Sequence, residues 1–183
     1  MDSDSTVLQS MDELFLSPPA PVAMPRAYWI WQKERTLSSQ LILVQPSREE
    51  FARVQQKVEN APPKDYDMEI VNQLYGDSAL ILPHRPYNML SGEFRSKNHT
   101  NYLGHADETW DPVAAYNEAK FVHFSDYPVP KPWLPLDELK MDENKPTCDV
   151  DEAGVEDCTA RDLWLGLYTD FQERRKVYHC VST

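Results

Sequence analysis

Short apolar runs alternate with segments of helical periodicity along most of this chain. The apolar runs predict strands, which lie at residues 21–30, 41–44, 79–82 and 120–124. Pro25 would place the first of these at a sheet edge or at a bulge, because proline has no amide hydrogen to donate. The continuous run 41–44 is typical of a strand that is buried on both faces.

Helices are predicted where apolar side chains recur every three or four residues. These segments begin at Ser47, Tyr66, Asp111 and Thr159, and a single helical turn is expected over 11–16. Ser47 and Glu50 form a capping box, and Gly76 is well placed to end the second helix. Residues 84–107 follow neither period and are expected to form a long loop. Strands that alternate with helices predict an α/β fold.

The composition changes after Trp133. Residues 134–158 carry nine acidic side chains and few large apolar ones, which predicts a solvated linker without a core of its own. The predicted organisation is therefore a main domain over 1–133, an acidic linker over 134–158, and a C-terminal helix and tail over 159–183. Leu163, Leu167 and Phe171 form the apolar stripe of that helix.

Charge and length narrow the classes of function. A chain of 183 residues can bury the core of one domain, and its net charge of −12 argues against nucleic acid or an anionic membrane as a partner. No apolar run approaches the roughly 18 residues of a membrane span, and no basic-then-apolar leader follows Met1. These observations do not identify the cellular compartment of the protein.

The three cysteines, Cys148, Cys158 and Cys180, fit no zinc-binding pattern. Cys148 and Cys158 bracket a short acidic loop and would pair in an oxidising lumen, whereas three free thiols are the equal alternative. Asn98-His99-Thr100 is a glycosylation sequon, which has meaning only in a secretory protein.

Candidate chemistry begins at the first residues. Asp2 and Asp4 flank one residue, and two carboxylates at that spacing suit Mg²⁺ or Mn²⁺ when a strand end presents them. His123 ends a predicted strand and is an acceptable third ligand, and Lys131 lies in the turn that follows. The simpler interpretations are a polar chain end, a core histidine and, for Asp67, an acid in the first turn of a helix.

These segments together resemble the family 8 retaining glycosyltransferases, which are glycogenin-like enzymes with a GT-A fold. The segment from Asp2 to Phe15 resembles their metal-binding Asp-x-Asp segment, and 123–133 resembles their His-Phe-x-Gly-x-x-Lys-Pro-Trp motif, without its glycine and with two extra residues before the lysine. Asp67, Ile70 and Asn72 match their Asp-Gln-Gly-Ile-Leu-Asn element. In the place of their Asn-Ser-Gly only Ser39 matches. Other short segments are similar to a fungal branch related to N-acetylglucosaminyltransferases.

The resemblance implies a role for each matched residue. Asp2, Asp4 and His123 would hold Mn²⁺ or Mg²⁺ on the diphosphate of a UDP-linked sugar donor, and Asp2, Lys131 and Ser39 would contact that donor. Lys131 would assist departure of the nucleotide, and Asp67 would stabilise the transferring sugar, whose transition state is oxocarbenium-like. The acceptor would be a glycan or a protein. In the family a strand precedes the Asp-x-Asp motif, so the nucleotide-binding half is expected to be missing here.

Two other classes fit parts of the pattern. The chain would be a non-catalytic remnant if its sheet edges lack the strands that they should meet. It would be a phosphatase of the haloacid-dehalogenase kind if Asp2-Ser3-Asp4-Ser5-Thr6 is an Asp-x-Asp-x-Thr motif whose first acid attacks phosphate. That second alternative leaves the segment from His123 to Trp133 unexplained.

Overall fold

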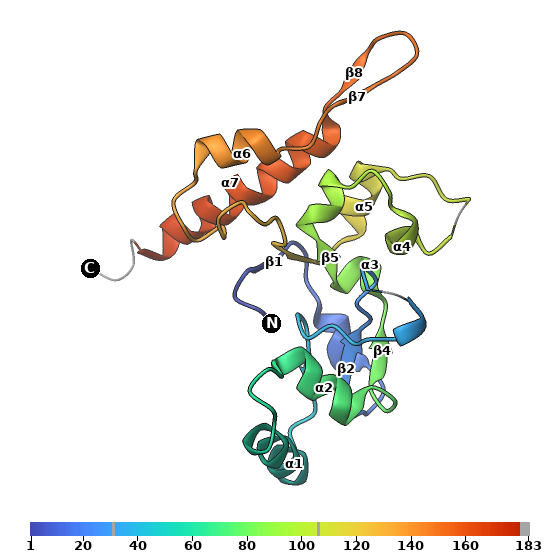
Figure 1. Ribbon diagram of the computed structural model, residues 1–183, viewed down its shortest axis with the longest axis vertical. Helices are drawn as coiled ribbons and strands as arrows, with labels where there is room; N and C mark the ends of the chain where they lie inside the picture. Colours follow the sequence, from blue (N-terminus) through green and yellow to red (C-terminus); the bar gives the residue numbers. More distant parts are fainter. Residues whose placement is uncertain (31, 106, 180–183) are drawn as a thin grey trace.

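The structure is a computed structural model and describes residues 1–30, 32–105 and 107–179. Figure 1 shows the first sheet near the middle of the molecule, the second sheet with α1 and α2 below it, and the helices α6 and α7 above it. Three clusters of buried apolar side chains hold these parts together, and the largest lies under α7. The mixture of short mixed sheets and helices confirms the predicted α/β class.

The first sheet has the order β1-β6-β5. Its strands are β1 (Ser5–Val7), β6 (Phe121–His123) and β5 (Met89–Leu90). β1 runs antiparallel to the central strand β6 and pairs Ser5 with His123, while β5 runs parallel to it. Phe121 and Val122 are completely buried, which explains the uninterrupted apolar pattern that predicted this strand.

The second sheet has the order β3-β2-β4. Its strands are β2 (Val22–Pro25), β3 (Leu43–Val44) and β4 (Leu80–Leu82). The predicted edge position of Pro25 is wrong, because β2 is the central strand. Pro25 is tolerated there as the last residue of the strand, where its carbonyl still accepts from the amide of Ser38 at 2.9 Å. β3 is itself an edge strand, and Val44 in it is 57% exposed. The prediction that residues 41–44 form a strand buried on both faces is therefore also wrong.

Two predicted helices flank this sheet. They are α1 (Arg48–Glu59) and α2 (Asp67–Tyr75). The Ser47 hydroxyl caps α1 by accepting from the amide of Glu50 at 3.3 Å, and the Gly76 amide donates to Asn72 O at the end of α2. A Cβ at Gly76 would lie 2.7 Å from that carbonyl, so the cap requires glycine. Part of the apolar stripe of α1 stays in solvent, since Phe51 is 70% and Val58 is 54% exposed, whereas Val54 packs against a core cluster.

The predicted long loop over 84–107 is wrong for the part that the structure describes. This segment folds into short elements, namely α3 (His84–Tyr87), β5, η3 (Ser91–Arg95) and α4 (Thr100–Leu103). Each element is too short to show a period in the sequence, and each is held by tertiary burial. Met89, Phe94 and Tyr102 are all deep in the largest core cluster.

The C-terminal part is built on a long helix. Its elements are α5 (Pro112–Glu118), α6 (Glu138–Asn144), β7 (Asp149–Val150), β8 (Glu156–Asp157) and α7 (Thr159–His179). α7 buries Trp164, Leu167 and Tyr168, which includes part of the predicted stripe. Two 3₁₀ turns, η1 (Asp12–Leu16) and η2 (Gln32–Glu34), complete the chain. Among the described helices, none is both long and apolar enough to cross a bilayer.

The acidic segment 134–158 has more structure than its composition predicts. Met141 of α6 is buried in the main core, and the β7–β8 hairpin is closed by a disulfide between Cys148 and Cys158. The structure thus selects the paired alternative for these two cysteines, while Cys180 lies outside the described residues. The division into a main domain, a linker and a C-terminal helix stays a prediction.

Candidate functional site

Strand pairing brings the acidic N-terminus against the end of β6. The amide of Phe124 donates to Asp4 O at 2.8 Å, one step beyond the Ser5–His123 pair. The two acids therefore lie immediately before β1. The amide of Asp2 donates to Gln40 O at 3.0 Å, which fixes the turn before β1 to the segment before β3.

Asp2, Asp4 and His123 converge on one point. His123 Nε2 lies 3.2 Å from Asp4 Oδ1 and 3.7 Å from Asp2 Oδ2, and one potential ligand atom from each residue lies within 4.8 Å of the other two. The sequence predicted this set of three as metal ligands, and the structure brings them together. The two carboxylates are hard oxygen donors that suit Mn²⁺ or Mg²⁺, and an imidazole beside them is an acceptable third ligand for Mn²⁺.

Burial and charge set the protonation of this cluster. Burial lowers the pKa of His123, against the opposing effect of the Asp4 carboxylate, and this favours the neutral imidazole that a metal requires. Burial raises the pKa of Asp2, and the charges of Asp4 and Asp67 raise it further. Burial also acts to raise the pKa of Asp4, but the hydrogen bond from Lys131 and the charges of His123 and Lys131 lower it below the usual value.

Lys131 reaches the same cluster from the loop after β6. Its ammonium donates to Asp4 Oδ2 and, at 2.7 Å, to Phe124 O. The two extra residues in this loop therefore do not move the lysine away from the acids. The ammonium neutralises one oxygen of Asp4 while the other oxygen faces His123.

Asp126 holds this loop in place, and the sequence analysis did not single it out. It stands where the similar family motif has glycine, its side chain is completely buried, and it accepts hydrogen bonds from Tyr168 at 3.0 Å, from Arg95 at 3.3 Å and from Ser91. An acid inside an otherwise apolar segment is the signal that could have found it, because buried carboxylates need partners. Its bonds tie the loop to α7 and η3.

The helix α2 supplies the remaining predicted residues. Asp67 is its exposed first residue, and its charge acts on Asp2, so the two carboxylates belong to one electrostatic field. Asn72 exchanges two hydrogen bonds with the backbone of Leu37, at 2.7 and 2.9 Å, and this fixes the start of segment 37–40. Ser39 is half-buried in that segment, next to the residue that binds the Asp2 amide.

Two buried polar atoms in this region have no protein partner within the described residues. They are His123 Nδ1 and Gln40 Oε1. Metal-bound histidines usually donate their second nitrogen to an acceptor that orients the ring. Here burial and the contacts of the other ring nitrogen, Nε2, orient the ring. The cluster fits a cation through its three converging ligand atoms.

Comparison with known proteins gives relatives in fungi. The chain is 57% identical over 179 residues to glucose N-acetyltransferase 1 of Gibberella zeae, which covers 96% of this chain and 39% of that protein. It is 48% identical over 195 residues to glucose N-acetyltransferase 1 of Aspergillus fumigatus, which covers 100% of this chain and 51% of that protein. A protein of the same name from Debaryomyces hansenii is 32% identical over 176 residues, covering 79% of this chain and 37% of that protein.

No family model and no solved structure matches the chain.

The chain spans about half or less of the length of the curated relatives that it matches. The matched region covers 96% of this chain for the Gibberella zeae protein and 100% for the Aspergillus fumigatus protein. The chain is similar, over this shared part, to fungal proteins named glucose N-acetyltransferase 1.

Proposed function

We propose that this chain carries the metal and diphosphate site of a retaining, Mn²⁺-dependent glycosyltransferase that uses a nucleotide-sugar donor. The observation that carries the proposal is the convergence of Asp2, Asp4 and His123 beside Lys131. The printed name of the fungal relatives joins a sugar to an N-acetyl group, which favours glucose or N-acetylglucosamine as the transferred unit. The GT-A fold belongs to the same proposal, supported by the order of the three motifs along the chain.

The cation site would be formed by Asp2 Oδ2, Asp4 Oδ1 and His123 Nε2, the atoms that already face one another. A bound Mn²⁺ would supply charge neutralisation for the donor diphosphate. The protein contributes a turn before β1 that is fixed by Gln40 and Ser5, so the carboxylates are held before any ligand arrives. Such preorganisation reduces the cost of binding.

Lys131 would act on the leaving nucleotide. Its ammonium now neutralises Asp4, and a cation bound to that carboxylate would release it toward the diphosphate, where its charge would stabilise the departing oxygen. The loop is anchored through Asp126, so the lysine keeps a fixed origin while its flexible side chain changes partner.

Asp67 would face the transferring sugar. A carboxylate near an oxocarbenium-like carbon stabilises the positive charge of the transition state. Asp67 fits this role because it is exposed at the N-terminus of α2, and its charge reaches Asp2. Ser39 and the donor contact proposed for Asp2 would complete the surface that the donor meets, and the acceptor would be a glycan or a protein.

The phosphatase alternative is not favoured. It assigns Asp2 as a nucleophile and gives His123 no role, whereas in the structure His123 lies within 3.7 Å of Asp2 and 3.2 Å of Asp4. The names of the relatives also indicate transfer of a sugar-related group and not phosphate hydrolysis. The same relatives favour a transferase over a non-catalytic remnant.

Titration calorimetry with MnCl₂ tests the cation site directly. We expect one Mn²⁺ to bind the wild-type chain, and Asp4→Asn or His123→Ala to weaken binding by about tenfold or more, because each removes one of three ligands. Asp12→Asn is the matched control, since Asp12 is an exposed acid of η1 outside the cluster. Unchanged affinity in both site variants would overturn the metal assignment.

Transfer is tested with UDP-N-acetylglucosamine and UDP-glucose in the presence of Mn²⁺. We expect release of UDP to require the cation and to fall by about 100-fold or more in Asp67→Asn, since the carboxylate acts on the transition state. Metal affinity should be unchanged in that variant. Release that is equal with and without Mn²⁺ would contradict the proposal.

A further inference from the structure

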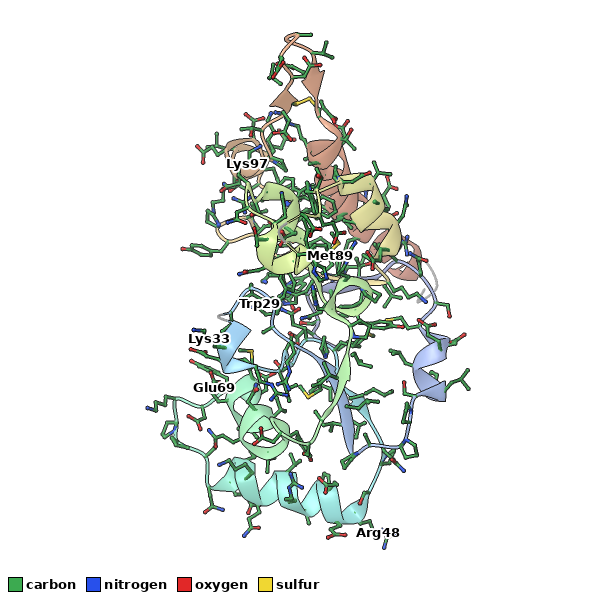
Figure 2. All side chains as sticks on the ribbon, turned by 90° about the vertical axis from the view of Figure 1, so that its right-hand side faces the viewer. Trp29, Lys33, Arg48, Glu69, Met89 and Lys97 are labelled. Carbon is green, nitrogen blue, oxygen red and sulfur yellow. A yellow bond between two sulfur atoms is a disulfide. The ribbon has the colours of Figure 1, made fainter. Side chains whose placement is uncertain are left out.

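A groove with charged, polar and apolar lining residues lies along one side of α2. It has a volume of about 490 Å³ and runs between the segment that follows η2 and the side of α2. Glu34, Arg35 and Thr36 form one wall, and Glu69, Asn72 and Asp77 lie on the other. We call this feature the Arg35 groove. Figure 2 shows Lys33 of η2 above Glu69 of α2 on one edge of the molecule, where the two walls meet the solvent.

The lining of the groove selects a class of ligand. Three carboxylates face one guanidinium, so a phosphate or another anion would meet net repulsion. The walls offer few apolar side chains, which disfavours an apolar ligand. Among the described residues, the three carboxylates are not close enough together to form a metal cluster. Sugar hydroxyls both donate and accept, and therefore match a surface that mixes carboxylate, hydroxyl and guanidinium groups.

These groups are also available for a ligand. Within the part of the chain that the structure describes, Glu34, Arg35 and Asp77 form no ion pair.

Arg35 is held in a strained conformation. Its φ is 51°, in the left-handed region that residues other than glycine seldom adopt. The Arg26 guanidinium donates to the carbonyl of Arg35 and, at 3.4 Å, to that of Gly76, so one half-buried cation joins both walls of the groove. Backbone strain that neighbouring contacts hold in place is common where a side chain must face a ligand.

The groove shares its elements with the proposed catalytic site. Glu69 and Asn72 follow Asp67 along α2, and Asn72 also fixes Leu37 at the start of the segment that binds Asp2. A ligand in the groove would therefore lie against the helix that presents Asp67. Asp67 itself does not line the groove.

We propose that the Arg35 groove binds a neutral saccharide through its hydroxyl groups. This step rests on the proposed function only in naming that saccharide the acceptor. Saturation-transfer NMR with the methyl α-glycosides of glucose, galactose and mannose tests binding without donor or Mn²⁺. We expect transfer to at least one glycoside in the wild-type chain and equally in Asp4→Ala, because the groove does not use the metal ligands.

Variants of the groove locate the binding. Arg35→Ala and Asp77→Asn should each weaken the NMR signal by at least about fivefold, as charged partners of hydroxyl groups are lost. Arg35→Gly removes the same guanidinium but accepts the left-handed backbone, so it tests the side chain even if Arg35→Ala disturbs the fold. Arg48→Ala is the control, since Arg48 is an arginine at the start of α1 and does not line the groove.

The outcomes separate this inference from the proposed function. Saccharide binding that is lost in the Arg35 and Asp77 variants supports the groove, whether or not Mn²⁺ binds the chain. No transfer to any glycoside in the folded wild type, or equal transfer in all variants, overturns it. Tighter binding of inorganic phosphate than of any glycoside at Arg35 would also overturn it, because the ligand would then be an anion.

Discussion

Asp4 and Lys131 form an ion pair across 127 residues of chain. The pair joins the turn before β1 to the loop after β6, and Asp4 uses its second carboxylate oxygen to face His123. One carboxylate therefore serves both the proposed cation and the lysine that would act on the nucleotide. The proposed cation and the Lys131 ammonium would therefore compete for the Asp4 carboxylate.

Lys131→Met should tighten the binding of Mn²⁺ in the absence of donor, by about three- to fivefold. The ammonium competes with the cation for Asp4, and a half-exposed ion pair is worth about 1 kcal/mol or less. The same variant should weaken the binding of UDP, because it removes the positive charge of Lys131 that would lie next to the diphosphate. Calorimetry with MnCl₂ and then with UDP gives both affinities.

Lys57→Met on α1 is the control for that experiment, since it removes a lysine far along the chain from the cluster. Weaker Mn²⁺ binding in Lys131→Met than in the wild type would show that the lysine supports the cation site and does not compete with it. That result would contradict the role given to the ion pair.

Tyr168→Phe should destabilise the fold by about 1–3 kcal/mol. The Tyr168 hydroxyl donates to Asp126 at 3.0 Å, and removing it leaves a completely buried carboxylate with fewer partners. Urea unfolding followed by tryptophan fluorescence measures the free energy of unfolding. Tyr127→Phe is the matched control, because Tyr127 lies in the same loop but is 92% exposed; an equal loss in both variants would contradict the prediction.

The sequence predicted which polar side chains would lie together better than it predicted the packing around them. Asp2, Asp4, His123 and Lys131 were chosen by residue type and by the order of motifs, and the structure brings all four together. The proximity of Asp4 and His123 follows from one strand pair, Ser5 with His123, and β1 was not among the strands that the apolar pattern predicted. The anchoring role of Asp126 was missed because it depends on partners from η3 and α7, which only the folded chain brings near.

Errors in the fold have a common physical cause. Apolar patterns predict that an element forms, but not what covers it, so the apolar run 41–44 became an edge strand, and Phe51 and Val58 of the α1 stripe stayed exposed. Elements of two to five residues, such as β5 and η3, are too short for periodicity to detect. The helices with clear caps, α1, α2 and α5, were predicted to within about one or two residues.

The exposed stripe of α1 leads to a prediction about stability. Phe51→Ser should cost less than about 0.5 kcal/mol, since the side chain already lies largely in solvent. Leu167→Ala in α7 should cost about 2–5 kcal/mol, because it leaves a cavity in the main core. Chemical denaturation measures the free energy of unfolding of both variants. A large decrease in this free energy for Phe51→Ser would mean that α1 buries its apolar face in solution.

Stability should also depend on pH through Glu13. The Glu13 carboxylate accepts hydrogen bonds from Lys120 and Tyr87, which lower its pKa from 4.5 to about 2. A carboxylate with a lowered pKa in the folded state stabilises the protein above its unfolded pKa, and this contribution is lost as the pH falls from about 4.5 toward 2. The wild type should therefore lose stability over that range.

Glu13→Gln isolates this contribution. The difference in free energy of unfolding between wild type and Glu13→Gln should be present at pH 7 and should shrink as the pH falls below 4.5. Denaturant titrations at pH 7, 4.5 and 2.5 measure it. A difference that is constant over this range would mean that the contacts of Glu13 with Lys120 and Tyr87 do not depend on its charge.

Removing the disulfide should loosen the acidic hairpin without affecting the cluster of Asp2, Asp4 and His123. Cys148 and Cys158 close a short loop, and the chain-entropy model gives a stabilisation of at most about 3 kcal/mol for a loop of this size. We expect Cys148→Ser with Cys158→Ser to lower the free energy of unfolding within that limit. Dithiothreitol should lower the free energy of unfolding of the wild type by the same amount and leave that of the double variant unchanged. Mn²⁺ affinity should be equal in both proteins, because the hairpin lies beyond α6 and α7 from the cluster (Figure 1). A loss of Mn²⁺ binding on reduction would instead connect the hairpin to the site.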